Sequence, residues 1–510
     1  MAANNPTDPF PEMDLPPLPN EIVFKILLMI PIVYLNMRKH PQATLINCAS
    51  SARKISQLSS GCRDYFLKTP ELWAQNIEWC HPNQQWFIIT LERSQPLPLD
   101  VTFKLQRGYW RGNPTLPPEM KRNFNIAQKL FSTRIRTLDM YVMGGWRDLE
   151  IQLDLPLNTL EALSFACPKS SAETTVPFRG LILDTALFPS LDKAPALPRL
   201  RSLKLTGSLV PYPNPVYQHL QTLAVFDIRH QLSVPEWLQK LSYLTQLSNL
   251  TIKGSVKQLK DSVGEIEKIR LPKLESLSLA GKVGQPGIGM ETFLTHILTR
   301  RGCSLYLSGR LNLEGSEYSS ITNGLTVWLG RWRVDDYRST AMHVSLDFDR
   351  IIFHNQWGEK PWPGLNFRIS FGWPTEYFHK MDNDDLLCDI ISDLATETIP
   401  ILQQSFNVTR QLNIWTSRGQ SVIPWTDFLG RFPAVTTLTL KERRIIKSSS
   451  GPGKEQLTTK SILSALDTSR VSGNASELEP TGGVIVPNLR KVIITGRKEG
   501  VSELDYSKAM

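Results

Sequence analysis

The phrase Leu200-Arg201-Ser202-Leu203-Lys204-Leu205 decides the predicted fold, because apolar and polar residues alternate in it after an opening leucine. Alternation with a period of two is typical of a β-strand that buries one of its faces. The pattern is apolar-x-x-apolar-x-apolar, where x is any residue. It occurs at Ile135–Leu138–Met140, Leu160–Leu163–Phe165, Leu200–Leu203–Leu205, Leu220–Leu223–Val225, Leu247–Leu250–Ile252, Leu274–Leu277–Leu279, Val435–Leu438–Leu440 and Leu489–Val492–Ile494. We expect a strand at each of these places.

The spacing of the copies suggests how the strands are arranged. Leu200, Leu220, Leu247 and Leu274 are 20, 27 and 27 residues apart. Such spacings, with an L-x-x-L-x-L core, match the template of leucine-rich repeats, whose units stack to share one core. Residues 130–500 are therefore expected to form an irregular leucine-rich-repeat domain.

The pattern is weaker in two parts of this region. Between residues 300 and 430 the frame is less regular, and the candidate strands there are Ser304–Leu307, His343–Phe348, Asn366–Ser370 and Gln411–Ile414. Residues 446–483 are rich in Ser and Gly, which predicts a flexible insertion with a short helix around Lys460–Leu466.

Composition excludes several classes of protein. The 510 residues are 41% hydrophobic and 21% charged, which is typical of a chain with packed cores. Six scattered cysteines are too few for a disulfide scaffold. The longest uncharged apolar run, Ile26–Leu35, is shorter than the roughly 20 residues of a membrane span and contains Pro31. We expect a protein of the cytoplasm, the nucleus or both, without a membrane partner.

No motif for bond chemistry is found. The chain lacks a phosphate-binding G-x-x-x-x-G-K-[ST] loop, an H-E-x-x-H metal motif, a G-x-S-x-G nucleophile motif and a C-x-x-C pair. Cys80-His81 is too small a set for a metal site. We therefore expect no catalytic residue, no metal and no cofactor.

Two features are candidates for recognition. Trp357, Trp362 and Trp373 lie close together in the sequence, either as a recognition surface or as packing over irregular structure. The net charge of +9 is spread along the chain, which favours acidic partners without specifying nucleic acid. Nucleic-acid binding is accordingly the less favoured reading.

The segment Asn20–Met29 predicts a helix that is apolar almost all round, since only Asn20, Glu21 and Lys25 in it are polar. Such a helix needs cover on more than one side. A partner protein or later residues of the same chain could provide it, and the pattern alone leaves both readings open.

A family resemblance bears on this choice. The stretch from Leu18 to Leu27, LPNEIVFKIL, resembles the opening of an F-box, and Cys62-Arg63-Asp64-Tyr65-Phe66 followed by Thr69-Pro70-Glu71-Leu72-Trp73 resembles its closing phrase. Residues 86–101 resemble the segment that follows the F-box in many fungal F-box proteins. The spacing between the two phrases is longer than usual, and Tyr65 or Phe66 stands where the family has Trp.

The resemblance implies a fold class of α + α/β, a small helical F-box domain followed by a leucine-rich-repeat solenoid. The domains would be a disordered tail at 1–16, the F-box domain at 17–80, a helical linker or cap at 81–129 and the repeats at 130–500. Cys62 and Trp73 would belong to the domain core, and Pro70 would stop the preceding helix.

The resemblance also implies a function. The chain would be a non-catalytic subunit of a Skp–cullin–F-box ubiquitin ligase, binding the Skp-type adaptor, and through it a cullin, while the repeats hold an unknown protein substrate. The implied adaptor contacts are Leu18, Pro19, Glu21, Ile22, Ile26 and Leu27. The alternative is a repeat-based interaction or scaffold protein that has no link to ubiquitination.

Overall fold

The structure is a computed structural model of the whole chain. It describes residues 63–64, 67–75, 77, 79, 81–105, 118–142, 159–166, 198–207, 219–228, 232–254, 256, 266–281, 288–300, 303–310, 323–328, 331, 341–347, 350–354, 367–372, 409–416, 425–430, 432–442, 462–466, 486–495 and 501–505. The chain divides into two compact units. The first comprises residues 1–138 and 145–149, and the second comprises 139–144 and 150–510.

The first unit combines helices with strands. Its elements are α4 (Pro70–Gln75), α5 (Gln84–Arg93), β1 (Leu99–Leu105), α6 (Pro118–Phe131), the 3₁₀ turn η1 (Ser132–Arg134) and the beginning of β2 (Ile135–Val142). The described helical residues before Pro70 end at Leu67, as expected, and Pro70 opens the next helix, α4, because a proline at the first helical position has no hydrogen bond to lose. Asn83 caps α5, since its side chain accepts a hydrogen bond from the Trp86 amide at 3.0 Å.

Apolar side chains from both helices and strands form the core of this unit. Phe87 and Leu91 of α5, Phe124 of α6, and Leu99 and Val101 of β1 are all at most 1% exposed. These five residues all lie within 81–129, which the sequence assigned to one helical linker or cap, and the structure adds the strand β1 to that segment.

The second unit is built on a large sheet. In order across the sheet, the first seven strands that lie wholly in this unit are β3 (Ala162–Ala166), β4 (Ser202–Thr206), β5 (Thr222–Phe226), β6 (Asn249–Lys253), β8 (Ser276–Ala280), β10 (Ser304–Arg310) and β13 (Phe367–Gly372). Beyond these lie β12 (Arg350–His354), β11 (Ala341–Asp347), β14 (Gln411–Thr416), β15 (Thr437–Glu442), β16 (Lys491–Thr495) and β17 (Val501–Asp505), in that order across the sheet. Neighbours from β3 to β13 are parallel.

The eight predicted strands are confirmed, and so are the four candidates between residues 300 and 430. Equivalent leucines lie in register, so that Leu203 pairs with Leu223, Leu223 with Leu250, and Leu250 with Leu277. All four are at most 2% exposed. Every second residue therefore enters one continuous core, as the alternation predicted.

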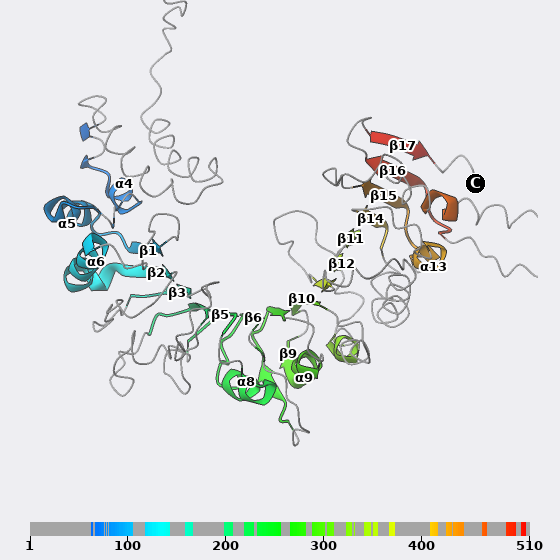
Figure 1. Ribbon diagram of the computed structural model, residues 1–510, viewed down its shortest axis with the longest axis horizontal. Helices are drawn as coiled ribbons and strands as arrows, with labels where there is room; N and C mark the ends of the chain where they lie inside the picture. The colour runs from blue at the N-terminus through cyan, green and yellow to red at the C-terminus, as the bar shows by residue number, and fades with distance from the viewer. Residues whose placement is uncertain are drawn as a thin grey trace, which may run out of the picture. The chain divides into compact units, whose positions relative to one another are not determined.

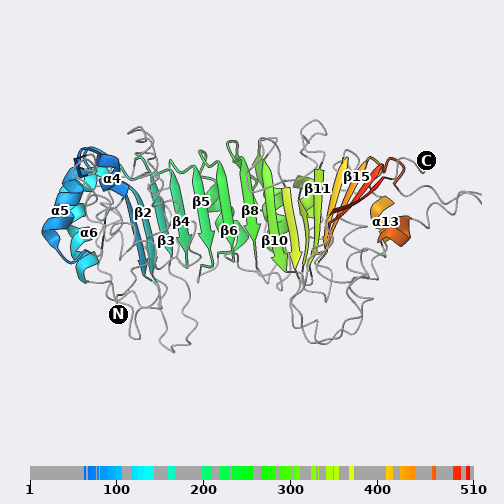
Figure 2. The same ribbon diagram turned by 90° about the horizontal axis from the view of Figure 1, so that it is seen from above.

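Helices cover one side of this sheet. They are α8 (Val234–Leu241), α9 (Ile288–His296) and α13 (Trp425–Gly430), and a small separate sheet pairs β7 (Ile269–Leu271) with β9 (Ile297–Thr299). Ser233 and Glu236 form a capping box at the start of α8, whose Trp237, Leu238 and Leu241 are buried. Figure 1 shows α8 and α9 on the same side of strands β5 to β10. Figure 2 looks onto the opposite side, where no described helix crosses β3 to β10.

The expected fold class, a small helical F-box domain followed by a leucine-rich-repeat solenoid, is wrong. The described residues form a large, mainly parallel sheet with helices, which is an α/β arrangement. A stack with one strand per repeat keeps its strands in chain order, whereas here β10 is followed by β13, β12, β11 and then β14. In addition, β12 is antiparallel to both of its neighbours. Alternation specifies which residues form strands, but not the order in which the strands pair.

Candidate binding face

The residues expected to contact an adaptor cannot be placed. Leu18, Pro19, Glu21, Ile22, Ile26 and Leu27 all lie outside the described residues, as do Cys62 and the tryptophans 357, 362 and 373. From the closing phrase of the resemblance, Trp73 is described. It is 9% exposed and meets Trp86 edge-on with ring centroids 6.1 Å apart, which confirms its expected place in a core.

Arg134 links two elements of the first unit through hydrogen bonds. The Arg134 guanidinium donates to the carbonyl oxygens of Leu91, Ser94 and Leu97 and to the Ser94 hydroxyl, over distances of 2.7–2.9 Å. These bonds join the end of α5 to the turn before β2. Partial burial lowers the pKa of Arg134 from its usual value because water is removed from the cation.

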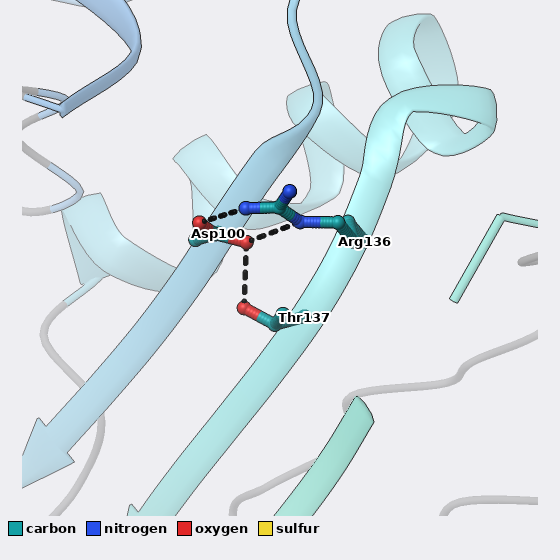
Figure 3. A network of polar contacts seen from close by, with 3 residues as sticks. All are labelled: Asp100, Arg136 and Thr137. Atoms are coloured by element: carbon teal, nitrogen blue, oxygen red, sulfur yellow. Dashed lines mark hydrogen bonds and ion pairs between the residues drawn. The ribbon is translucent and has the colours of Figure 1, made fainter. Parts of the chain in front are cut away.

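A second network joins β1 to β2 (Figure 3). Asp100 accepts two hydrogen bonds from Arg136, of 3.2 and 2.8 Å, and one from the Thr137 hydroxyl of 2.9 Å. The side chains of Arg136 and Asp100 are 42% and 52% exposed. Solvent screens such a pair, so it aligns the two strands and contributes little stability.

The described residues contain no cluster of three His, Cys, Asp or Glu side chains that could hold a metal ion. Burial raises the pKa of the Cys303 thiol to about 12, so it stays protonated and is a poor nucleophile. The described helices also include none long and apolar enough to span a membrane.

The open side of the parallel sheet is the better candidate for a site. We call the outward side chains of three neighbouring strands the β4–β6 face. It consists of Ser202, Lys204 and Thr206 of β4, Thr222, Ala224 and Phe226 of β5, and Asn249, Thr251 and Lys253 of β6. None of these nine side chains is buried. In each strand the second and fourth residues are buried instead, because they point to the other side of the sheet.

Phe226 lies at the centre of the charged part of this face. The Lys204 ammonium is 5.6 Å from the centroid of the Phe226 ring, a cation–π contact that restrains the long lysine side chain. On the other side, Lys253 of β6 is the register partner of Phe226. Phe226 therefore lies on the strand between the two strands that carry Lys204 and Lys253.

The backbone holds the ends of these strands in place. After β4, β5 and β6 come Gly207, Asp227 and Gly254, with left-handed φ angles of 77°, 47° and 59°. Their amides donate to Phe226, Lys253 and Ala280 on the next strand over, at 2.8, 2.7 and 2.7 Å. Each of the three strands therefore ends in the same kind of turn. These turns help to hold Phe226 and Lys253 in register on neighbouring strands.

A similar pair occurs farther along the sheet of the second unit. Lys441 of β15 lies 5.0 Å from the ring centroid of Trp415 on β14, and the two residues are register partners. Trp415 is 41% exposed. Pairing of a lysine with an aromatic ring is therefore found twice on described strands of the sheet.

Sequence reasoning missed these residues. It considered the clustered tryptophans 357, 362 and 373 and a positive charge spread along the chain. The usable signal was in the polar positions of the recurring phrase, where Lys204, Phe226 and Lys253 stand between or directly after the buried residues.

Comparisons with known proteins give no further guidance, because no family model, no curated protein and no solved structure matches the chain.

Proposed function

We propose that the chain is a non-catalytic substrate-recognition subunit of a Skp–cullin–F-box ubiquitin ligase. The segment that resembles an F-box would bind the Skp-type adaptor, and the sheet of the second unit would bind the protein substrate. The observation that carries the binding role is the β4–β6 face, which is open, polar and positively charged. The link to ubiquitination is carried by the sequence resemblance of residues 18–27 and 62–73.

Such a subunit acts by proximity. Holding a substrate lysine near a ubiquitin carrier converts a bimolecular encounter into an almost intramolecular one, which raises the effective concentration of the lysine. This mechanism needs a rigid binding surface and no catalytic group of its own. A face formed by hydrogen-bonded parallel strands meets the first requirement.

The adaptor contact is proposed on the apolar character of residues 22–29. Ile22 and Ile26 are four residues apart, so on a helix they would lie on one stripe together with Leu18. Covering each large side chain contributes roughly 1.5–3 kcal/mol. A partner that buries this stripe therefore gains substantial binding energy from a few residues.

The test is co-purification of the full chain with a Skp-type adaptor and a cullin. The double variant Ile22→Asp/Ile26→Asp is expected to lower the recovered adaptor at least tenfold. A matched control is Tyr243→Asp, which also places a carboxylate at an exposed apolar position, but in the second unit. Unchanged adaptor recovery by the double variant would refute the proposed contact.

The second candidate is an interaction or scaffold protein without a link to ubiquitination. It is favoured by the location of the β4–β6 face, whose residues all belong to the second unit, whereas residues 18–27 belong to the first. A chain that binds a ligand on this face but recovers neither adaptor nor cullin would have this function.

A further inference from the structure

We propose that the β4–β6 face binds an extended acidic segment of a partner protein, with Phe226 as the apolar anchor and Lys204 and Lys253 as contacts for carboxylates. The inference names the class of substrate for the proposed function. Only the statement that the bound partner is a ligase substrate rests on the proposed function.

Charge complementarity argues for an acidic occupant. The outward positions on strands β3, β4, β5, β6 and β8 carry hydroxyl, amide and small apolar groups, together with Phe226 and two lysines. None of these positions holds Asp or Glu. Three acidic residues flank these strands in the sequence: Glu161 directly precedes β3, Asp227 directly follows β5 and Glu275 directly precedes β8. An acidic segment lying across the strands would therefore meet cations without facing carboxylates at these positions.

The spacing of the cations matches an extended peptide. Lys204 and Lys253 are two strands apart and, by register, two residues apart along the strand direction. With about 4.8 Å between strands and about 3.3 Å per residue, their Cα atoms are roughly 12 Å apart. An extended chain covers this distance in about three to four residues. The recognised segment would have acidic residues at that separation with an apolar residue between them.

Phe226 supplies the apolar contact that strengthens binding beyond the exposed ion pairs. Exposed ion pairs contribute little because water competes for both partners. An aromatic ring that gives apolar contact beside the charges excludes part of that water, and aromatic residues are common among the positions that dominate binding energy. The contact with Lys204 also restrains the cation before binding, so less side-chain entropy is lost.

A protein segment fits this face better than nucleic acid. Nucleic-acid affinity comes mainly from neutralising several phosphates, with six to ten contacts in a typical site. On the outward positions of β3, β4, β5, β6 and β8 there are two lysines and no arginine. Small hydroxyl side chains around one aromatic ring instead suit contact with a peptide.

The experiment uses the full chain and fluorescence anisotropy. The probe is a fluorescein-labelled peptide of about ten residues with Glu at every third position and Leu between them, a spacing taken from the strand geometry. The matched peptide has Gln in place of Glu, and an unlabelled single-stranded DNA of about ten nucleotides serves as competitor. We expect the Glu peptide to bind at least tenfold more tightly than the Gln peptide.

The variants locate the site. Lys204→Glu/Lys253→Glu is expected to weaken binding of the Glu peptide at least tenfold, and Phe226→Ser at least fivefold. The control Lys268→Glu/Lys273→Glu makes the same change of charge at exposed lysines outside the face, and should change affinity less than twofold. Equal effects of the two double variants, or no effect of the first, would overturn the inference. Stronger binding of DNA than of the Glu peptide, lost in the first variant, would assign the face to nucleic acid.

Adaptor recovery measured on the same variants separates this inference from the proposed function. Lys204→Glu/Lys253→Glu should retain the adaptor while losing the peptide. A chain that binds the peptide but recruits no adaptor refutes the proposed function alone. A chain that recruits the adaptor but shows no preference for the Glu peptide refutes the inference alone.

Discussion

Gly254 leaves the space that the Asp227 carboxylate occupies. A Cβ atom at Gly254 would lie 2.3 Å from Asp227 Oδ1, which is far closer than two such atoms can approach. Both residues have left-handed backbone angles, with φ of 59° and 47°, at the ends of the neighbouring strands β6 and β5. The turn that ends the β4–β6 face therefore depends on a glycine at one position and a short polar residue at the other.

Gly254→Ala is expected to destabilise the second unit. A left-handed conformation costs a residue with a Cβ atom about 1–2 kcal/mol, and the contact with Asp227 adds to this. Urea unfolding followed by circular dichroism measures the change. The double variant Gly254→Ala/Asp227→Gly removes the contact but keeps the alanine, so it should recover part of the loss. A single variant as stable as the original chain would contradict the geometry.

Arg134→Ala is expected to destabilise the first unit by about 2–4 kcal/mol, because it leaves three backbone carbonyls without their charged donor. Arg136→Ala is the matched control, since its partner Asp100 is largely exposed and the loss should stay within about 1 kcal/mol. Thermal unfolding of the two variants compares them directly. Equal effects would show that the Arg134 bonds contribute no more than a surface pair.

Leu250→Ala is expected to cost about 2–5 kcal/mol, because the side chain is 1% exposed and its removal leaves a cavity in the shared core. Its neighbour Thr251 points to the opposite side of the sheet, so Thr251→Ala should change stability by no more than about 0.5 kcal/mol. The free energies of unfolding of both variants, measured in urea, test the alternation. A larger loss for Thr251→Ala would mean that the faces are assigned the wrong way round.

Cys303 is expected to resist alkylation in the folded chain. Burial is the main cause that raises the pKa of its thiol to about 12, so little thiolate forms near pH 8. Iodoacetamide labelling with mass spectrometry of the tryptic peptide 302–310 reports on this residue separately from the other cysteines. Urea should restore ordinary reactivity. Rapid labelling without urea would show that the thiol is accessible.

The same pKa shift predicts a pH dependence of stability. The unfolded thiol ionises near pH 9, whereas the folded one keeps its proton to about pH 12. The unfolded state then binds fewer protons, so the free energy of unfolding falls as pH rises from about 9 to about 12 and is unaffected by this group below that range. Cys303→Ala should show a weaker fall over the same pH range. An identical fall in both chains would attribute the effect to other groups.

The strands of the second unit could be predicted because their signal is local. Each recurring phrase buries its own alternate residues, as Leu250 and Ile252 do, and this pattern is read without knowing the neighbouring strand. The same rule missed β12, whose central residues Ile351, Ile352 and Phe353 are all apolar and show no alternation. It would have found β1, in which Leu99, Val101, Phe103 and Leu105 alternate with polar residues, but that segment was expected to be helical.

The candidate site could be predicted only in part. Lys204, Phe226 and Lys253 occupy polar positions of three successive phrases, so their common face follows from the alternation. That Lys204 lies over Phe226 depends on the lateral register, and the register is set by backbone bonds such as that from the Thr222 amide to the Arg201 carbonyl, at 2.9 Å.

Alone, the amino-acid sequence determined where the strands of the core lie, because burial of every second side chain is decided within a few residues. The tertiary structure decided the order β10, β13, β12, β11 and β14, and with it an α/β sheet in place of a stack of repeats. It also decided that no described helix crosses one side of β4 to β6, where Lys204 contacts the Phe226 ring. Both outcomes depend on which distant strands pair, and that choice is made by the free energy of the whole folded chain.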